Sequence, residues 1–461
     1  MKALGPLLAI LTATSAGTGL TLALWRRSGT ILAAELFGYS WLLGAGLVSL
    51  LLALAGTVLS GTALLAVVTV AMVPLGIYGI GLFRTKAVRI ESGWAEAPVW
   101  EMWLGALALV PIGYMSWAVF RDAIMWDGLF IWEAKARHAF LSGGSLPASY
   151  FSDASRVQYH PSYPLYLPFT ELWVYLWTGD CDQTAVKAVF PMFYAAAIAL
   201  LWSGTRRLGG RPWMAALAAL LPLFVPLMAD HGLGLAQGYA DLILGAVYLG
   251  GVSALLAWRV KGLPAGWPVA VACAAMLPWI KQEGLFLLAS LVILAALMDW
   301  SRRSGEFRSR ALGFCGSMLL FIAPGAFIAA GWRIALRMLH VQEANTFHPF
   351  TLENLLAGLP RLGTIFHSMG AHFAELKYWS LLWFTVPVAL LTLAWQRRSE
   401  ALWLGVALLA PLAFDVVPYL FTTLDLVFHV TTSLDRLYLQ VSLVGVLALG
   451  VALRGRGESN Q

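Results

Sequence analysis

The sequence predicts an all-α polytopic membrane protein, and three observations lead to that fold class. Of the 461 residues, 60% belong to the apolar set AVILMFWYC, only 12% are charged, and the mean hydropathy is +0.75. Soluble domains are about 45–50% apolar and about 25% charged, so this chain lacks the polar residues to cover a water-facing surface. Its apolar residues fall in runs of roughly 20, the length of a membrane-spanning helix. The composition excludes a soluble globular protein, a disordered chain and, with 3 cysteines, a disulfide scaffold.

Thirteen apolar segments are predicted to cross the membrane. Two of them are short and are separated by Lys281 and Glu283, which predicts a tight helical hairpin. The predicted spans cover residues 3–25, 37–59, 61–83, 98–120, 186–205, 212–229, 240–258, 266–280, 284–300, 311–332, 379–396, 400–421 and 437–453.

Basic residues predict the orientation of these spans. Cytoplasmic loops carry an excess of Lys and Arg, and alternate loops of this chain hold 18 of its 30 basic residues. The protein is therefore predicted to be a multi-pass inner (cytoplasmic) membrane protein with its N-terminus outside and its C-terminus in the cytoplasm. Met1 and Lys2 also resemble the start of a signal peptide or anchor, but Arg26 and Arg27 favour a span. The net charge of +6 thus reflects orientation, and no nucleic-acid partner is predicted.

The chain divides into residues 1–97, with about three spans, and a module of residues 98–461. Two long irregular segments, 121–185 and 333–378, fall on the predicted outer side, as do all eight histidines. Because loops carry function on a rigid scaffold, chemistry or recognition is expected outside the membrane.

The first outer segment opens on a predicted surface helix. From Trp126 to Leu141 apolar residues recur at helical spacing, which is typical of a helix lying along the membrane surface. Asp127 in its first turn is either a helix cap or a catalytic carboxylate, and the cap is the commoner role. Glu133 and Lys135 are expected on a solvated face.

A proline-rich stretch follows in the same outer segment. Three prolines within eight positions after His160 predict a rigid, extended entry into a short apolar helix, Phe169 to Trp177. This helix is either re-entrant or interfacial without chemistry, or it presents His160 and Tyr163 to a polar ligand.

Charged residues at the predicted outer membrane edge are functional candidates because they are costly there unless paired or solvated. Asp241 begins a span, and Asp230 with His231 is at most a weak metal half-site. Lys281 either marks the hairpin turn or holds an anionic group. Arg436 is either a snorkelling anchor or a fork for phosphate oxygens.

The second outer segment contains Arg333 and Arg337, which share a helix face and precede His340. These arginines contact either lipid headgroups or the phosphate of a substrate.

The order of these outer-side features resembles the GT-C superfamily of integral-membrane glycosyltransferases. The closest likeness is to the bacterial branch of protein O-mannosyltransferase-like and aminoarabinose-transferase-like enzymes. The resemblance covers about residues 98–440, although the family often has adjacent acids in its first outer loop and fewer preceding spans. The motifs that carry it are Trp126-Asp127-Gly128, His160-Pro161-Ser162-Tyr163-Pro164-Leu165-Tyr166-Leu167-Pro168, Gly238-Tyr239-Ala240-Asp241, Lys281-Gln282-Glu283-Gly284 and Thr432-Ser433-Leu434-Asp435-Arg436-Leu437.

This resemblance implies a cell-envelope enzyme that moves a sugar from a polyprenyl-phosphate donor to a hydroxyl of a glycan, lipid or protein acceptor. Transfer would take place on the outer face, with inversion and an Asp base. No obligatory cofactor is expected, although a divalent metal is possible. The implied roles are general base for Asp127, a second acid for Asp241 or Asp230, donor phosphate binding for Lys281, Arg436, Arg333 and Arg337, and substrate binding for His160, Tyr163, Glu283, His429 and Trp126.

Two other classes share much of this pattern. A transporter or flippase of lipid-linked sugars would show polar residues at the bilayer midplane and inverted repeats, and neither is evident in the sequence. A ligase of lipid-linked glycans would use Arg333, Arg337 and His340 more than Asp127.

Overall fold

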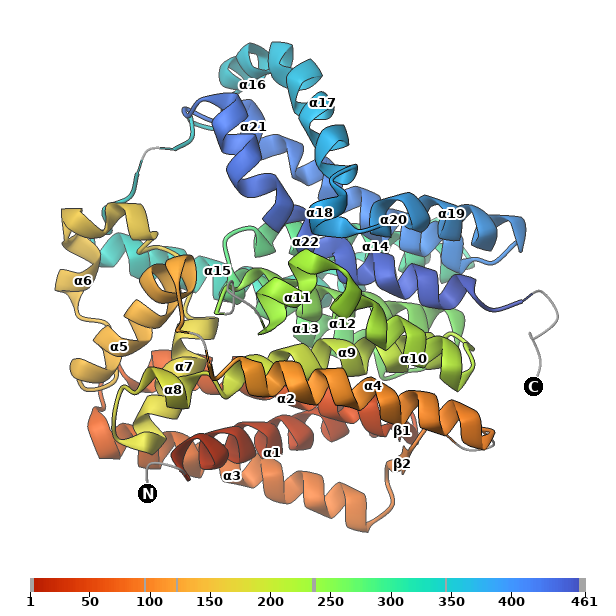
Figure 1. The fold of residues 1–461 in the computed structure, drawn as a ribbon, viewed down its shortest axis with the longest axis horizontal. Helices are drawn as coiled ribbons and strands as arrows, with labels where there is room; N and C mark the ends of the chain where they lie inside the picture. The colour runs from red at the N-terminus through yellow and green to blue at the C-terminus, as the bar shows by residue number, and fades with distance from the viewer. Residues whose placement is uncertain (1–3, 95–96, 122, 234–237, 345, 456–461) are drawn as a thin grey trace.

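The computed structural model describes residues 4–94, 97–121, 123–233, 238–344 and 346–455 (Figure 1). In these ranges the chain is helical almost throughout, with one two-stranded parallel sheet and one isolated bridge. The prediction of an all-α polytopic membrane protein is consistent with this architecture.

The N-terminal helices pack closely because glycines face their neighbours. Methyl groups added at Gly17 and Gly19 of α1 would overlap backbone carbonyls of α2 and α3, at Ser40 and Leu75. The elements of this region are α1 (Gly5–Trp25), β1 (Thr30–Leu32), α2 (Ala33–Ala55), α3 (Gly61–Arg84), β2 (Arg89–Glu91) and α4 (Val99–Ala118).

The first long outer segment folds into short helices. The entry expected to be extended instead forms a turn, in which the backbone N–H of Tyr163 donates to the carbonyl of His160 at 3.0 Å. Helix α7 follows and stops at Gly179, a glycine with a left-handed φ of 72°. The short apolar helix expected after the prolines is therefore confirmed. The elements are the π-helix η1 (Gly128–Glu133), α5 (Ala134–Leu141), α6 (Ala148–Ser152), the 3₁₀ helix η2 (Ala154–Tyr159), α7 (Tyr166–Thr178) and α8 (Gln183–Val186).

The centre of the bundle is formed by α12, which is buried along nearly its whole length against α9, α13 and α22. The predicted hairpin is present as α13 and α14, joined at Lys281 to Glu283. The middle elements are α9 (Val189–Arg207), α10 (Pro212–Leu220), η3 (Leu221–Phe224), α11 (Pro226–Leu233), α12 (Asp241–Val260), α13 (Gly266–Ile280) and α14 (Gly284–Arg302).

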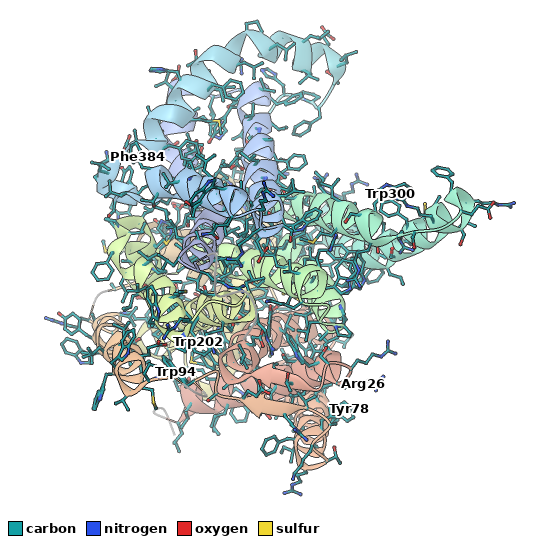
Figure 2. All side chains as sticks on the ribbon, turned by 90° about the vertical axis from the view of Figure 1, so that its right-hand side faces the viewer. Arg26, Tyr78, Trp94, Trp202, Trp300 and Phe384 are labelled. Carbon is teal, nitrogen blue, oxygen red and sulfur yellow. The ribbon has the colours of Figure 1, made fainter. Side chains whose placement is uncertain are left out.

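The C-terminal third surrounds this centre. Helix α15 lies at the edge of the bundle and leaves most of its surface exposed (Figure 2), whereas α22 is buried through its second half. Helix α17 runs across the direction of α19 and α20 (Figure 1). The elements are α15 (Phe307–Met338), α16 (Leu352–Gly358), η4 (Leu359–Arg361), α17 (Leu362–Phe373), α18 (Leu376–Trp379), α19 (Leu382–Trp395), α20 (Glu400–Phe414), α21 (Val416–Phe421) and α22 (Leu426–Ala452).

Nine helices in the described part of the chain are long and apolar enough to cross a membrane, which supports a multi-pass protein. A tenth candidate is bent by 83° between Pro212–Phe224 and Pro226–Gly232. Helices α13 and α19 are apolar but short. Every predicted span overlaps a helix, yet the count of thirteen stays a prediction.

The two predicted sets of loops lie at opposite ends of the bundle, and each end has its own contacts. At one end, Arg207 bonds to Glu35 at 2.7 Å, and Trp94 packs on Trp202 (Figure 2). At the other end, the indole Nε1 of Trp173 in the outer segment donates to the carbonyl of Ala9 in α1 at 3.1 Å. Helix α1 begins at one end of the bundle and α22 finishes at the other (Figure 1).

Candidate functional site

An ion pair joins the first outer segment to the last helix. Asp127 precedes η1, and its Oδ2 lies 2.5 Å from Nη1 of Arg436 on α22, although 309 positions separate the two residues. The carboxylate makes no capping bond to the helix that follows. Asp127 therefore does not act as the helix cap that was its commoner interpretation. Its backbone N–H donates to the hydroxyl of Tyr239 at 3.3 Å.

Helix α22 places several polar groups along one side. The carboxylate of Asp435 accepts from the backbone N–H of Arg436 at 2.8 Å. Gln440, one helical turn after Arg436, donates from Nε2 to Oδ1 of Asp241 at 2.9 Å. His429 lies two turns before Arg436, and its Nδ1 pairs with the hydroxyl of Thr422 at 2.8 Å.

Lys281 is the centre of a buried charge network. Its ammonium lies 2.8 Å from Oδ1 of Asp241 and 2.9 Å from Oε1 of Glu283, and its side chain is only 4% exposed. Burial opposes the charge on Lys281, but the two carboxylates outweigh it and raise its pKa above the ordinary value. The other oxygen of Glu283, Oε2, is buried without a hydrogen-bond partner in the described structure.

The turn at residues 160–163 borders this network. The rings of His160 and Tyr163 stack with centroids 4.6 Å apart, and the Tyr163 ring lies 5.8 Å from Nζ of Lys281. His160 has a left-handed φ of 47°, a conformation that side chains other than glycine seldom adopt. Burial lowers the pKa of His160 to about 4, so its imidazole is neutral at pH 7.

Lys135 holds this turn in place. Its Nζ donates to the carbonyls of His160 at 2.8 Å and Tyr163 at 3.2 Å, and it lies 5.5 Å from the centre of the Trp132 ring. Burial lowers the pKa of Lys135 to about 7. The opposite side of the turn is bound at Ser162, whose hydroxyl accepts from Gln282 and whose carbonyl accepts from the indole Nε1 of Trp332, both at 2.8 Å.

The expectation of a solvated face for Glu133 and Lys135 was wrong. Both side chains are buried, because the segment forms η1 and α5 and packs against α7. Oε1 of Glu133 accepts from the Tyr175 hydroxyl at 2.6 Å and lies 3.4 Å from Nε of Arg137. The predicted single surface helix is likewise a π-helix that continues into α5.

The structure brings together six of the predicted site residues, namely Asp127, Asp241, Lys281, Glu283, Tyr163 and Arg436, with His160 stacked on Tyr163. His429 lies in the first turn of α22, two turns before Arg436. Arg333 and Arg337 are exposed on α15, and neither contacts Asp127 or Lys281 in the described part of the chain. Trp126 is 66% exposed next to Asp127.

Sequence reasoning missed Gln440 and misplaced Lys135. Gln440 carried a usable signal, since it is an amide within an apolar span and lies four positions after Arg436. Lys135 carried none, because only the packing of α5 against α7 buries it.

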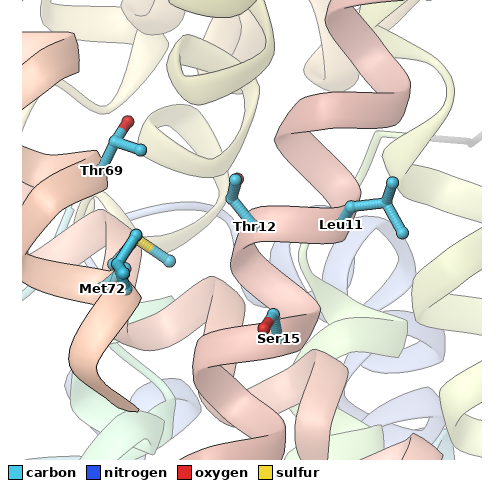
Figure 3. Close-up of a pocket in the computed structure, with 6 residues that line it drawn as sticks. Leu11, Thr12, Ser15, Thr69 and Met72 are labelled. Atoms are coloured by element: carbon cyan, nitrogen blue, oxygen red, sulfur yellow. The ribbon is translucent and has the colours of Figure 1, made fainter. Parts of the chain in front are cut away.

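Two further features bear on ligands. The described residues contain no group of three or more His, Cys, Asp or Glu side chains able to hold a metal ion. A cavity between α1 and α3, lined by Leu11, Thr12, Ser15, Thr69, Met72 and Val73 (Figure 3), contains none of the predicted site residues. The prediction that transfer needs no obligatory ion stays a prediction.

Comparisons with known proteins found no matching family model, no matching curated protein and no matching solved structure.

Proposed function

We propose that the protein is an integral-membrane glycosyltransferase of the GT-C type, which moves a sugar from a polyprenyl-phosphate donor to an acceptor hydroxyl outside the cytoplasmic membrane. The observation that carries the proposal is the pair of Asp127 and Arg436 beside the Lys281 network. A carboxylate able to accept a proton and a guanidinium able to hold phosphate lie 2.5 Å apart at one end of an apolar bundle. Sugar transfer from a phosphate needs both groups.

The proposed step is a single displacement. The acceptor oxygen attacks the anomeric carbon as Asp127 removes its proton, so one C–O bond forms while the bond from that carbon to the donor phosphate breaks. The bonding electron pair leaves on the phosphate oxygen, where Arg436 compensates the developing charge. Attack from the side opposite the leaving group inverts the anomeric centre, so in the reacting complex the sugar separates Asp127 from Arg436.

Arg436 is better suited than Lys281 to receive the donor phosphate. The Lys281 ammonium is already compensated by two carboxylates and is nearly inaccessible. The Arg436 side chain is 29% exposed and has one carboxylate partner, Asp127, at salt-bridge distance in the described structure. A guanidinium binds carboxylate and phosphate through the same fork of N–H donors. In this scheme Lys281 keeps Asp241 and Glu283 in place beside the Asp127–Arg436 pair.

The test separates donor binding from transfer. Full-length protein in nanodiscs is given radiolabelled polyprenyl-phosphate sugars, and donor binding and sugar transfer to membrane-extract acceptors are measured. We expect Asp127→Asn to lower transfer at least about 100-fold, because the base is lost. Donor binding should stay the same or tighten, since Arg436 is released from its ion pair. Arg436→Ala should weaken donor binding at least about tenfold, with partial recovery in Arg436→Lys.

Arg84→Ala is the matched control, because this arginine is exposed at the end of α3 and has no role in the proposed site. Full transfer activity in Asp127→Asn would exclude the proposed base. Donor binding unchanged in Arg436→Ala would exclude the proposed phosphate site. Transfer that persists in EDTA would support a reaction with no dissociable metal ion.

One observation favours transport of lipid-linked sugars as a second candidate function. The 83° bend between the α10–η3 segment and α11 is a broken helix that ends near His231, and interrupted helices are typical of transporter binding sites. Reconstituted vesicles distinguish the two functions. A transporter would move fluorescent polyprenyl-phosphate sugar between leaflets without forming a glycosidic bond, and Asp127→Asn would leave the chemistry of the donor unchanged.

A further inference from the structure

Three exposed aromatic rings border Asp127 on the outer segment. Phe130 is 48% exposed and Tyr159 is 41% exposed, and their rings stack with centroids 5.5 Å apart and an interplanar angle of 22°. Trp126 is 66% exposed and directly precedes Asp127 in the chain. These three residues are called the aromatic platform below.

Two separate segments build the aromatic platform. Phe130 belongs to η1, whereas Tyr159 ends η2, directly before His160. Lys135 joins the two segments, because it follows η1 in the chain and donates to the carbonyl of His160 at 2.8 Å. The hydrogen bond from Lys135 therefore links the segment that carries Phe130 to the segment that carries Tyr159.

The backbone at both segments is strained. Trp126 has a φ of 49° and His160 a φ of 47°, in the left-handed region that disfavours bulky side chains. Such conformations are energetically costly and cluster at functional sites. Glycine would remove this cost, yet position 126 holds a tryptophan whose side chain is 66% exposed. Aromatic residues that only anchor a protein in the bilayer interface require no such backbone conformation.

Polar groups lie beside the rings. Gln158 is exposed and directly precedes Tyr159, and the Asp127 side chain, 35% exposed, lies between Trp126 and Phe130 in the chain. Exposed rings offer flat apolar area at a low cost in side-chain entropy, and neighbouring polar side chains supply hydrogen bonds. This combination fits a pyranose ring, which presents a face of C–H groups and a rim of hydroxyls.

We infer that Trp126, Phe130 and Tyr159 form the acceptor subsite and that the acceptor is a glycan. The inference rests on the proposed function, because it takes Asp127 as the base that receives the acceptor proton. One sugar ring lies on the aromatic platform, and the next ring presents its hydroxyl to Asp127. A peptide backbone or an acyclic lipid headgroup has no comparable ring face with a rim of hydroxyls.

The test measures saccharide binding without catalysis. Full-length protein in nanodiscs is titrated with short soluble oligosaccharides of hexoses and N-acetylhexosamines, and binding is followed by ligand-detected NMR. We expect saturable binding that weakens at least about tenfold when Phe130→Leu and Tyr159→Leu are combined, since apolar bulk is kept and the rings are lost. Trp126→Asn should also weaken binding while the fold is kept, because asparagine tolerates the left-handed region.

The matched control is Trp103→Leu. Trp103 is also 66% exposed but lies on α4 among other exposed apolar residues, so its loss should leave saccharide binding unchanged. No saccharide binding by the parent protein, or equal binding by the platform variants, would overturn the inference. Protection of cysteines at positions 130 and 159 from a water-soluble reagent by the bilayer would assign the rings to lipid and would also overturn it.

Failure of the inference is distinguishable from failure of the proposed function. If transfer depends on Asp127 but the platform variants have an unchanged acceptor KM, the glycosyltransferase proposal is supported and the glycan subsite is excluded. Saccharide binding that depends on the rings, in a protein that forms no glycosidic bond, keeps the subsite and removes the enzyme.

Discussion

At the scale of single residues, the site contains ion pairs. The more deeply a pair is buried, the more each charge depends on its partner for stability. Asp241 begins α12 in an apolar environment and is tolerated because Lys281 and Gln440 both donate to its Oδ1. Asp127 and Arg436 stand nearer the surface, with side chains 35% and 29% exposed. The buried pair therefore serves structure, and the more exposed pair is free to exchange partners with a substrate.

Removing one member of the buried pair should be strongly destabilising. We expect Lys281→Met to lower the free energy of unfolding by about 3–5 kcal/mol, because Asp241 is left buried without its counter-charge. Denaturant-induced unfolding in detergent measures this loss. Lys377→Met removes an exposed ammonium 3.1 Å from Glu375 and should change stability little. Equal effects of the two substitutions would contradict the role of Lys281.

His160 should make stability depend on pH. Its pKa is lowered by burial to about 4, below the ordinary value of 6.5, so between these values the unfolded chain binds a proton that the folded protein does not. Stability should therefore fall as pH decreases from about 6.5 to 4. Thermal unfolding of the wild type and His160→Gln across this range isolates the contribution. Parallel pH profiles for the two proteins would show that His160 does not titrate in this way.

At the scale of elements, the helix positions were predictable and their ends were less so. Apolar runs predicted all nine helices that, in the described part of the chain, are long and apolar enough to cross a membrane, because such a run has no other low-energy structure in a bilayer. Periodicity suggested one helix from Trp126 to Leu141, whereas the chain forms a π-helix followed by α5. A π-helix has a wider turn than an α-helix, and in η1 it directs the side chains of Trp132 and Glu133 into the core. There Glu133 contacts Tyr175 of α7 and Trp132 stacks on Tyr163 of the 160–163 turn, and these partners are distant in the sequence.

Glycine positions offer a test of helix packing in the N-terminal region. A methyl group at Gly19 would overlap the Leu75 carbonyl of α3, so Gly19→Ala should destabilise the protein by about 1–3 kcal/mol. Gly81 on α3 has open space around it, and Gly81→Ala should be neutral or slightly stabilising because alanine favours helix. Chemical unfolding of both variants gives the comparison. Equal losses would mean that α1 and α3 are not packed as described.

At the scale of the whole molecule, orientation and architecture come from different sources. The distribution of Lys and Arg predicts which loops face the cytoplasm. The fold groups those loops at one end of the bundle, where Arg207 contacts Glu35 and Arg398 contacts the carbonyl of Leu208. It groups the outer segments at the opposite end with the candidate site.

Cysteine labelling in cells tests the predicted orientation. Cys181 and Cys315 are replaced by serine and the buried Cys273 by alanine, and a single cysteine is placed at Ser142 or Ser304, both of which are exposed. A membrane-impermeant maleimide should label position 142 in intact cells and position 304 only after lysis. Labelling of both positions in intact cells, or of position 304 alone, would contradict the topology and the outer location of the site.

The sequence by itself determined the class of molecule, the placement of its apolar helices and the small set of charged residues worth testing. It did so because these features are local properties of a chain: the length of each apolar run, the distribution of Lys and Arg among the loops, and the energetic cost of a charge near lipid. Only the tertiary structure decided which charges meet. Asp127 and Arg436 are 309 positions apart, and no periodicity links them. Burial of Lys135 and the stacking of Phe130 on Tyr159 likewise depend on packing between segments, which a single sequence does not encode in any short window.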